Sequence, residues 1–336
     1  MRAAFLASVI LLAACRRDEA LMKEEMNPPY VVQLAPGAPP LPVPAENPLT
    51  KAGVELGKKL FFEERFSNPA TVSCASCHHV ASAFSDTVAL SAGSTGSLGF
   101  RNAPTLGNVA YQQRLFMDGG VPNLELQVLA PIHDMIEMNS DITAVAELLR
   151  DEEPYKSLSL LAYGRRLDAY VITRAVASYE RTLVSGWSRW DRYANWNDAT
   201  ALTTEELNGW TIFSSGSANC TACHSGFDFT DRDYHNIGLT TDHSEDEGRA
   251  RITLLPDDLG KFKTPTLRNV ALTGPYMHNG SLATLEAVVD HFTSGGLAQP
   301  NLSPHMQSFA LTPQERADLV AFLRSLTDDR SLDQVP

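Results

Sequence analysis

The 336-residue sequence has few cysteines, a shortage of basic residues and no apolar run long enough to span a bilayer. Each of its five cysteines belongs to a sequence motif in which the thiol is expected to be modified, so no thiol remains to form a disulfide. The chain has 27 Lys and Arg residues and 40 Asp and Glu residues, so its formal net charge is −13. This negative charge argues against nucleic acid as a partner. The apolar run from Ala3 to Ala14 is too short for a transmembrane helix.

Four of the cysteines lie in two copies of the motif Cys-x-x-Cys-His, at 74–78 and at 220–224. Two thiols one helical turn apart suit thioether bonds to haem vinyl groups, and the histidine that follows suits the iron. Two disulfides or a shared zinc site would also use Cys-x-x-Cys pairs, but neither explains the histidines. The sequence therefore predicts two covalent c-type haems, attached through Cys74, Cys77, Cys220 and Cys223, with His78 and His224 as iron ligands.

The first residues are typical of an exported lipoprotein. Met1-Arg2 precedes the apolar run, and Leu12-Ala13-Ala14-Cys15 resembles a lipoprotein signal-peptidase site. We expect residues 1–15 to be the signal peptide and Cys15 to carry the lipid; the alternative is an ordinary cysteine inside a cleaved signal. Because c-type haem is attached outside the cytoplasm, this signal and the haem motifs together predict a periplasmic protein whose only membrane contact is its lipid anchor.

The rest of the chain contains an internal repeat. The segment 27–49 holds eight prolines and no apolar periodicity, which favours an extended linker over residues 16–46. Pro104–Ala110 is then matched by Pro265–Ala271, and the offset between these segments is larger than the offset between the two cysteine motifs. The second copy therefore carries an insertion, expected within Asp228–Asp258. We predict one domain over 47–196 and a second over 197–330.

Strand patterns are nearly absent, so the predicted fold is mainly α, with two cytochrome c-like haem domains and long loops. Capping boxes at Thr203 and Thr312 mark two helix starts. The apolar residues that follow Thr312 have helical spacing and are expected to cover the second haem. Further helices are expected at 50–62, 142–150, 168–183 and 283–293.

The two copies differ in polar residues that matter for chemistry. When they are aligned on their glycine turns, Gln127 stands against Val288, and Glu137 stands against Ala298. A carboxylate over one haem can take a proton from peroxide and return it to the leaving oxygen, and an amide can orient the peroxide. Glu137 and Gln127 are therefore the candidate catalytic residues. The alternative is that both are solvated residues flanking a loop.

Several segments resemble the bacterial dihaem cytochrome c peroxidase and MauG superfamily. They include Arg101–Thr105, Gln127–Met138, Lys263–Val270 and Thr273–Gly280, and the resemblance runs from about Pro42 to Thr327. It implies a peroxidatic haem in the first domain and an electron-transfer haem in the second, with Gln127 and Glu137 in the family's distal roles. It also implies a calcium ion bound by Asn102, Thr273 and Pro275, hydrogen peroxide as substrate, and a small cytochrome c or cupredoxin as electron donor. The family leaves a homodimer open as an alternative to a monomer.

Three positions depart from the family pattern. Ser94 stands where many members have a removable histidine ligand, which predicts an open iron in the first domain at rest. Met117 replaces the usual tryptophan between the haems and changes the expected electron relay. Phe292 replaces the family's distal Met or Tyr, so the sixth ligand of the second haem is left open among His291, Met277, His305 and Met306.

These features predict a dihaem peroxidase that reduces hydrogen peroxide to water with electrons from a small periplasmic redox protein. One alternative is MauG-like, peroxide-dependent oxidation of a partner protein. Another is a non-catalytic dihaem electron carrier, against which the polar asymmetry between the copies argues.

Overall fold

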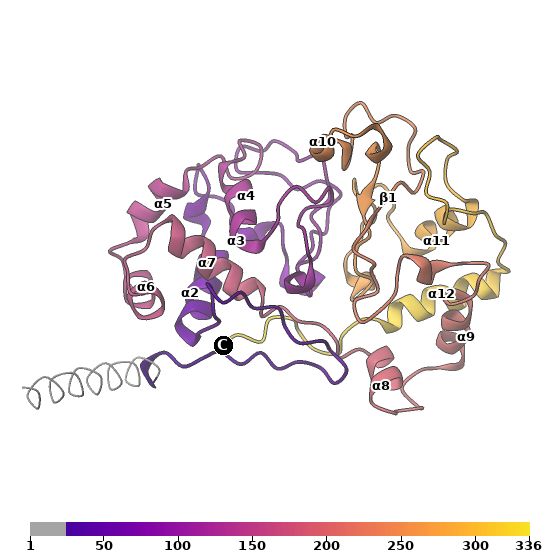
Figure 1. Cartoon of the computed structure of the whole chain (residues 1–336), viewed down its shortest axis with the longest axis horizontal. Coiled ribbons are helices and arrows are strands. Elements are labelled where there is room, and N and C mark those ends of the chain that lie inside the picture. Colours follow the sequence, from indigo (N-terminus) through magenta and orange to yellow (C-terminus); the bar gives the residue numbers. More distant parts are fainter. Residues whose placement is uncertain (1–24) are drawn as a thin grey trace, which may run out of the picture.

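The computed structural model describes residues 25–336 as two helical halves that lie side by side (Figure 1). The predicted signal peptide and Cys15 lie outside the described residues. Within this range the sheet is limited to β1 (Tyr234–His235) paired antiparallel with β2 (Phe262–Lys263), which confirms the mainly α fold class. No helix among the described residues is both long and apolar enough to cross a membrane.

The helices of the first half are α2 (Lys51–Phe61), α3 (Leu124–Gln127), α4 (Leu129–His133), α5 (Ile142–Leu149), α6 (Tyr155–Tyr163) and α7 (Ala169–Glu180). Those of the second half are α8 (Arg189–Asn195), α9 (Thr204–Phe213), α10 (Ala250–Thr253), α11 (Leu285–Ser294) and α12 (Pro313–Ser325). Both predicted capping boxes are confirmed: Thr203 accepts from the Glu206 N–H, and Thr312 from the Glu315 N–H.

The same helix crossing is built twice. In the first half α2 crosses α7 at Gly57, where a Cβ atom would overlap the carbonyl oxygen of Ala175. In the second half α9 crosses α12 at Gly209, where a Cβ atom would overlap the carbonyl oxygen of Asp318. Since only glycine lets the backbones approach this closely, the repeat in the sequence is a repeat of packing.

Each half has its own apolar core. The first contains Leu56, Leu60, Phe61 and Tyr179 among its fully buried side chains, and the second is built around Phe322 and the other apolar residues of α12. The C-terminal tail returns to the first half, where Leu332 and Val335 join its core.

The proline-rich segment is extended, and its described part packs against the body of the protein. Tyr111 donates a hydrogen bond to the Pro39 carbonyl at 2.9 Å, and Ala35 is buried beside Gly186. The segment therefore lies along both halves.

The halves meet through equivalent loops of the two copies. The Asn102 N–H donates to the His278 carbonyl at 2.8 Å, and the Lys263 N–H donates to the Met117 carbonyl at 2.7 Å. In the alignment that matches Pro104 with Pro265, Asn102 corresponds to Lys263 and Met117 corresponds to His278. This exchange of hydrogen bonds therefore has approximate two-fold symmetry.

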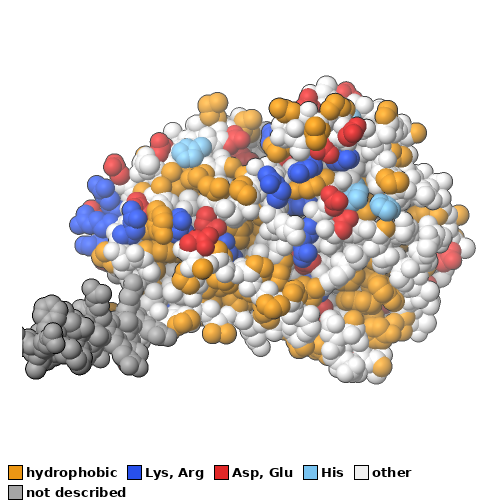
Figure 2. All heavy atoms as spheres, in the orientation of Figure 1, with side chains coloured by type: hydrophobic (Ala, Val, Ile, Leu, Met, Phe, Trp, Pro, Cys, Tyr) orange, Lys and Arg blue, Asp and Glu red, His pale blue; other side chains and the backbone are white. Residues whose placement is uncertain are grey.

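Ion pairs reinforce this junction. Asp118 is fully buried and accepts from Arg101 at 2.7 Å and from Arg251 at 3.1 Å, while Arg101 also binds Asp246. Arg251 and Asp246 belong to the Asp228–Asp258 stretch expected to hold the insertion, so this stretch ties the second half to the first. Figure 2 shows one group of basic side chains over the middle of the molecule and another at its left end, on a chain that is acidic overall.

Candidate active site

The first Cys-x-x-Cys-His motif forms a tight turn, η2 (Cys74–Ser76), in which the N–H groups of Cys77 and His78 both bond to the Cys74 carbonyl. Both cysteines are free thiols. His78 Nδ1 lies 2.8 Å from the Phe84 carbonyl oxygen. Because a carbonyl can only accept, Nδ1 carries the proton and Nε2 keeps a lone pair for a metal.

The second motif repeats this geometry in η5 (Cys220–Ala222). His224 Nδ1 lies 2.9 Å from the Phe229 carbonyl oxygen, and Cys220 and Cys223 are free thiols. Both Phe84 and Phe229 adopt a left-handed backbone, with φ of 59° and 50°, which turns each carbonyl toward its histidine. The two motifs are therefore equivalent in local structure.

The donors of both motifs fit a covalent haem. Burial lowers the pKa of His78 and of His224, which keeps each imidazole neutral, as an iron ligand requires. Burial raises the pKa of the Cys220 and Cys223 thiols to about 11, so neither is a thiolate poised for redox chemistry. A neutral, oriented imidazole beside two unpaired thiols is the arrangement that a c-type haem needs.

Glu137 lies in the turn between α4 and α5, close enough to the first motif for its charge to act there. The residue as a whole is exposed, but enough protein surrounds the carboxyl that burial raises its pKa, and neighbouring Asp134 adds to the rise. Its negative charge in turn helps to raise the pKa of the Cys74 and Cys77 thiols. The charge of this carboxyl therefore acts on both thiols to which a haem would attach.

Gln127 is the last residue of α3 and is half-buried. Its backbone N–H donates to Asn123, while its side chain makes no hydrogen bond with any described residue. The amide is therefore free to bind a ligand, although no direct contact with Glu137 is formed.

Ser94 is fixed by the same turn that carries Glu137. Its N–H donates to the Glu137 carbonyl at 2.7 Å, and its hydroxyl lies 3.0 Å from the Asn68 carbonyl. Gly93 packs so closely on the Ile136 carbonyl that a Cβ atom there would overlap it. This loop thus supports the backbone of Glu137 and offers no ligand at position 94.

Met117 and its counterpart His278 both lie at the junction of the halves. The imidazole of His278 stacks on Phe262, with ring centroids 3.8 Å apart and an interplanar angle of 10°. Burial lowers the pKa of His278 to about 4, so this ring is neutral at physiological pH. At this pair of equivalent positions the second copy therefore supplies an aromatic ring, whereas the first copy supplies a methionine.

The candidates for a sixth ligand in the second half differ in burial and in whether the ligating atom already has a hydrogen-bond partner. Nε2 of His291 lies 3.0 Å from the Ile237 carbonyl oxygen, so this nitrogen already has a partner. His305 is exposed, and Met277 and Met306 are partly buried. Phe292, next to His291, has no ligating atom.

The predicted calcium ligands come from both sides of the junction. The side-chain nitrogen of Asn102 donates to the Val88 and Ala89 carbonyls at 3.0 and 3.2 Å, which turns its Oδ1 away from them. The carbonyls of Thr273 and Pro275 accept no backbone hydrogen bond from the described residues. Three free oxygens of this kind suit a hard cation.

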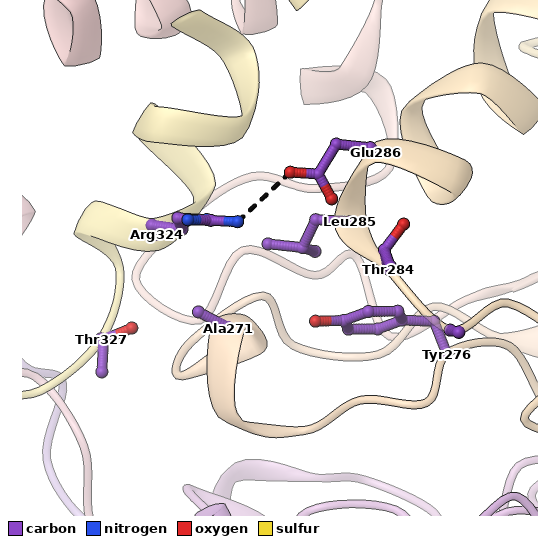
Figure 3. A pocket seen from close by; sticks show the side chains of 8 residues that line it. Ala271, Tyr276, Thr284, Leu285, Glu286, Arg324 and Thr327 are labelled. Carbon is purple, nitrogen blue, oxygen red and sulfur yellow. Dashed lines mark hydrogen bonds and ion pairs between the residues drawn. The ribbon is translucent and has the colours of Figure 1, made fainter. Parts of the chain in front are cut away.

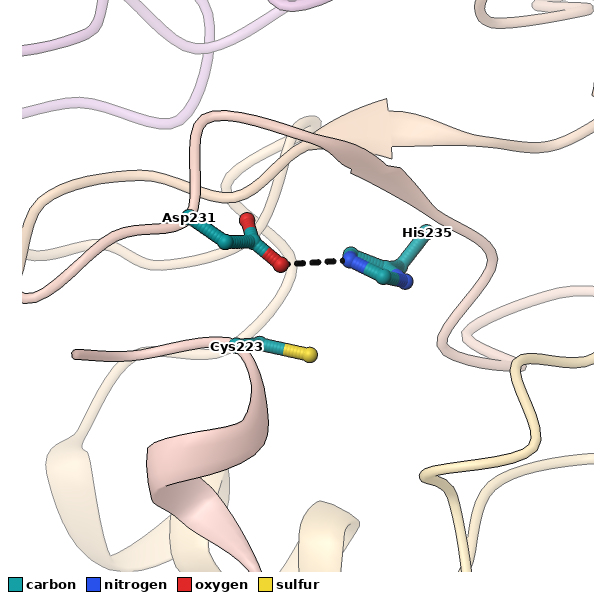
Figure 4. Close-up of side chains that lie close together, drawn as sticks. All are labelled: Cys223, Asp231 and His235. Carbon is teal, nitrogen blue, oxygen red and sulfur yellow. Dashed lines mark hydrogen bonds and ion pairs between the residues drawn. The ribbon is translucent and has the colours of Figure 1, made fainter.

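Two other features could be mistaken for the reaction site. In Figure 4, Cys223, Asp231 and His235 bring one potential ligand atom each within 4.8 Å of one another, and Asp231 bonds His235 at 2.9 Å. A haem thioether would use the Cys223 sulfur, which leaves the hydrogen-bonded carboxyl of Asp231 and imidazole of His235 beside the attachment site.

The second feature is a cavity of about 410 Å³ between the start of α11 and the end of α12 (Figure 3). Arg324 and Glu286 pair across it at 3.2 Å. The equivalent pair of the first half, Arg181 and Glu125, is covered by Asn47, whose amide donates to Glu125 at 2.8 Å. The cavity contains none of the predicted site residues.

Sequence reasoning missed Glu180, a buried carboxyl at the end of α7. The available signal in the sequence is the match of residues 179–183 with residues 322–326. In this match Arg181 aligns with Arg324 and Leu183 with Leu326, but Glu180 aligns with Leu323.

Comparison with known proteins identifies the family. A model of the family described as di-haem cytochrome c peroxidase matches residues 51–199, and one described as cytochrome c matches residues 207–327. MauG of Methylorubrum extorquens is 38% identical over 93% of this chain and 86% of its own length. Cytochrome-c peroxidase IdrP1 of Denitromonas iodatirespirans is 36% identical over 95% and 92%, and cytochrome c551 peroxidase of Nitrosomonas europaea is 32% identical over 88% and 86%.

Solved structures agree. A MauG-like protein associated with microbial copper homeostasis superposes with a TM-score of 0.86 at 32% identity, covering 91% of this chain and 97% of that one. The dihaem peroxidase BthA of Burkholderia thailandensis gives a TM-score of 0.72 at 26% identity, covering 92% and 98%. The resemblance predicted from the motifs is confirmed: the chain belongs to the bacterial dihaem cytochrome c peroxidase and MauG family, as a peroxidase-type oxidoreductase with two cytochrome c-type haem domains.

Proposed function

We propose that this protein reduces hydrogen peroxide to water at its first haem site and receives electrons through its second. The observation that carries the proposal is the asymmetry of the two motifs. Their histidines and thiols have the same local geometry, but only the first has the Glu137 carboxyl, whose pKa is raised and whose charge acts on the thiols.

The first site is proposed to hold its haem through Cys74, Cys77 and His78. When bound, a c-type haem supplies a redox-active iron at which peroxide can accept electrons. The carboxylate of Glu137 accepts a proton from the incoming peroxide and returns it to the departing oxygen, and the raised pKa of this group suits both roles near neutral pH. The free amide of Gln127 donates a hydrogen bond that orients the peroxide. Each peroxide consumes two electrons and two protons and yields two waters.

The second site is proposed to hold its haem through Cys220, Cys223 and His224 and to pass electrons onward. No acidic side chain stands at its equivalent of position 137, which is Ala298. Its role is therefore electron entry, from a small cytochrome c or a cupredoxin in the periplasm.

The proposal includes a calcium ion at the junction, bound by Asn102 Oδ1 and the carbonyls of Thr273 and Pro275. It also includes anchoring to a membrane through lipidated Cys15, and leaves a homodimer as the oligomeric alternative to a monomer.

A second candidate function is peroxide-dependent oxidation of a partner protein. It is favoured by the identity to MauG of Methylorubrum extorquens and by Ser94, which supplies no removable ligand to the first site. In this role the electrons would come from the side chains of a protein substrate.

The rate at which the peroxide-oxidised protein oxidises an electron donor distinguishes these two functions. The holoprotein is oxidised with stoichiometric peroxide and divided, one portion receiving reduced cytochrome c and the other standing alone. Rapid, peroxide-dependent oxidation of the cytochrome supports the peroxidase. Slow oxidation together with a long-lived oxidised state supports oxidation of a partner protein, and no reaction with peroxide contradicts both.

A further inference from the structure

Glu180 is a buried carboxyl that the proposed mechanism does not use. It is the last residue of α7 and is 4% exposed. Helix α7 packs against α2, α3 and α5, so this side chain lies inside the first half.

The Glu180 carboxyl has no hydrogen-bond partner among the described residues, and its Oε2 is fully buried. The neighbouring Arg181 does not neutralise it, because its guanidinium forms a bidentate pair with Glu125 at 2.7 and 2.9 Å. Leaving a buried carboxylate unpaired is costly, so the group is expected to keep its proton or to find a partner in a bound group.

Geometry places Glu180 near the first haem-attachment motif. The ring of its neighbour Tyr179 lies 6.4 Å from the ring of Phe84, whose carbonyl binds His78, and Cys74 packs against the same apolar core as α7. After burial, its charge is the largest contribution that raises the pKa of the Cys74 thiol, and Glu137 contributes to the same shift. The two carboxyls belong to different elements, α7 and the α4–α5 turn. The charges of two acidic groups therefore act on the first motif.

The second half has no such group. The end of α7 matches the end of α12: Asn108 N–H bonds the Leu183 carbonyl, and Asn269 N–H bonds the Leu326 carbonyl. Leu183 and Leu326 are therefore equivalent, and the same step back along each chain segment reaches Glu180 in the first half and Leu323 in the second. An apolar side chain thus fills this position in the second half, so packing does not require a carboxyl.

We propose that Glu180 is the proton-exchanging residue of the first haem site, binding a proton when that haem gains an electron and releasing it when the haem is oxidised. The inference rests on the proposed haem attachment at Cys74, Cys77 and His78. In this step the oxidised haem would take one electron from the redox donor, and the Glu180 carboxylate would take one proton from solvent. The products are the reduced haem and the Glu180 carboxylic acid. Glu180 would act through the charge of its carboxyl and is a positioning residue, separate from Glu137.

The physical reason is charge compensation in a medium of low dielectric constant. An electron added to a buried site raises the affinity of a nearby carboxyl for protons, because the two negative charges repel. Burial raises the pKa of Glu180 to about 8, the Arg181 charge lowers it and Glu125 raises it, so the group can exchange a proton near neutral pH. Of the groups on helices packed against α7, Glu125 on α3 acts on this carboxyl; the Cys74 thiol of η2 is the other ionisable neighbour.

The test is the midpoint potential of each haem in the holoprotein, measured by spectroelectrochemistry between pH 6 and 10. The first haem is identified by its response to peroxide. In the wild type its potential should fall as pH rises near 8, by at most about 59 mV for each tenfold drop in proton activity. Glu180→Gln keeps the shape of the side chain, and Glu180→Leu introduces the residue found at the equivalent position of the second half. Both variants should flatten the dependence of the first haem's potential on pH and leave that of the second haem unchanged.

The matched control is Glu286→Gln, which removes a carboxyl at the surface of the second half and should leave the slope of the first haem unchanged. An unaltered slope in Glu180→Gln, with both haems attached and the first still reactive toward peroxide, overturns this inference and leaves the proposed function standing. Loss of peroxide reactivity from the wild type itself would instead overturn the proposed function.

Discussion

Glu137 is the residue on which the chemistry depends. We predict that Glu137→Gln keeps both haems and slows formation of the peroxide-oxidised state by about 10² or more, because the amide can no longer move a proton. Stopped-flow absorbance after mixing with peroxide measures this rate. Glu147→Gln, which removes an exposed carboxyl of α5, should retain a rate close to that of the wild type.

The pH dependence of the same reaction has a definite sign. Since the pKa of Glu137 is raised, its basic form appears only above the usual carboxyl range, and the rate should rise with pH through that raised pKa. This acidic limb should vanish in Glu137→Gln. An identical limb in that variant assigns the ionisation to another group.

Glu180 should also influence stability. Its pKa is raised from 4.5 to about 8 in the folded chain, so between these values the folded state keeps a proton that the unfolded state has lost. The contribution of Glu180 to the free energy of unfolding should therefore be largest below the unfolded pKa and fall by about 1.4 kcal/mol per pH unit up to the folded pKa. Urea unfolding of Glu180→Gln across this range should show a smaller fall than the wild type.

At the scale of elements, the two helix crossings are the main packing device. Gly209→Ala places a methyl group on the Asp318 carbonyl where α9 crosses α12, and should cost about 1–3 kcal/mol of stability. Thermal unfolding of the holoprotein measures the loss. Gly216→Ala is the matched change, because a Cβ atom there meets nothing within 4 Å; equal stability of the two variants contradicts the packing argument.

The elements that could be predicted from the sequence are those with local signals. Capping boxes at Thr203 and Thr312 mark the starts of α9 and α12, and the expected helix over 142–150 is α5. Burial of Glu180 and the engagement of His291 by the Ile237 carbonyl depend on segments distant in sequence, so periodicity and spacing could not predict them. The candidate site divides in the same way: the contiguous motif residues and Glu137 were predicted from the sequence, whereas the effect of Glu180 on Cys74 depends on tertiary packing.

At the scale of the whole molecule, the junction is fixed by charge. Asp118→Asn removes the carboxylate shared by Arg101 and Arg251 and leaves cations without their buried partner, at a cost of about 3–5 kcal/mol. Urea unfolding followed by haem absorbance should show a lower midpoint. Asp290→Asn breaks an exposed pair with Arg316 and should cost at most about 1 kcal/mol.

The proposed function depends on one haem site that reacts with peroxide and one that does not. The most direct measurement is the visible spectrum of the ferric holoprotein before and after stoichiometric peroxide. We predict a high-spin component from the first site that disappears on mixing, beside a second haem that does not bind peroxide. Two low-spin haems, both inert to peroxide, would contradict it and leave a simple electron carrier.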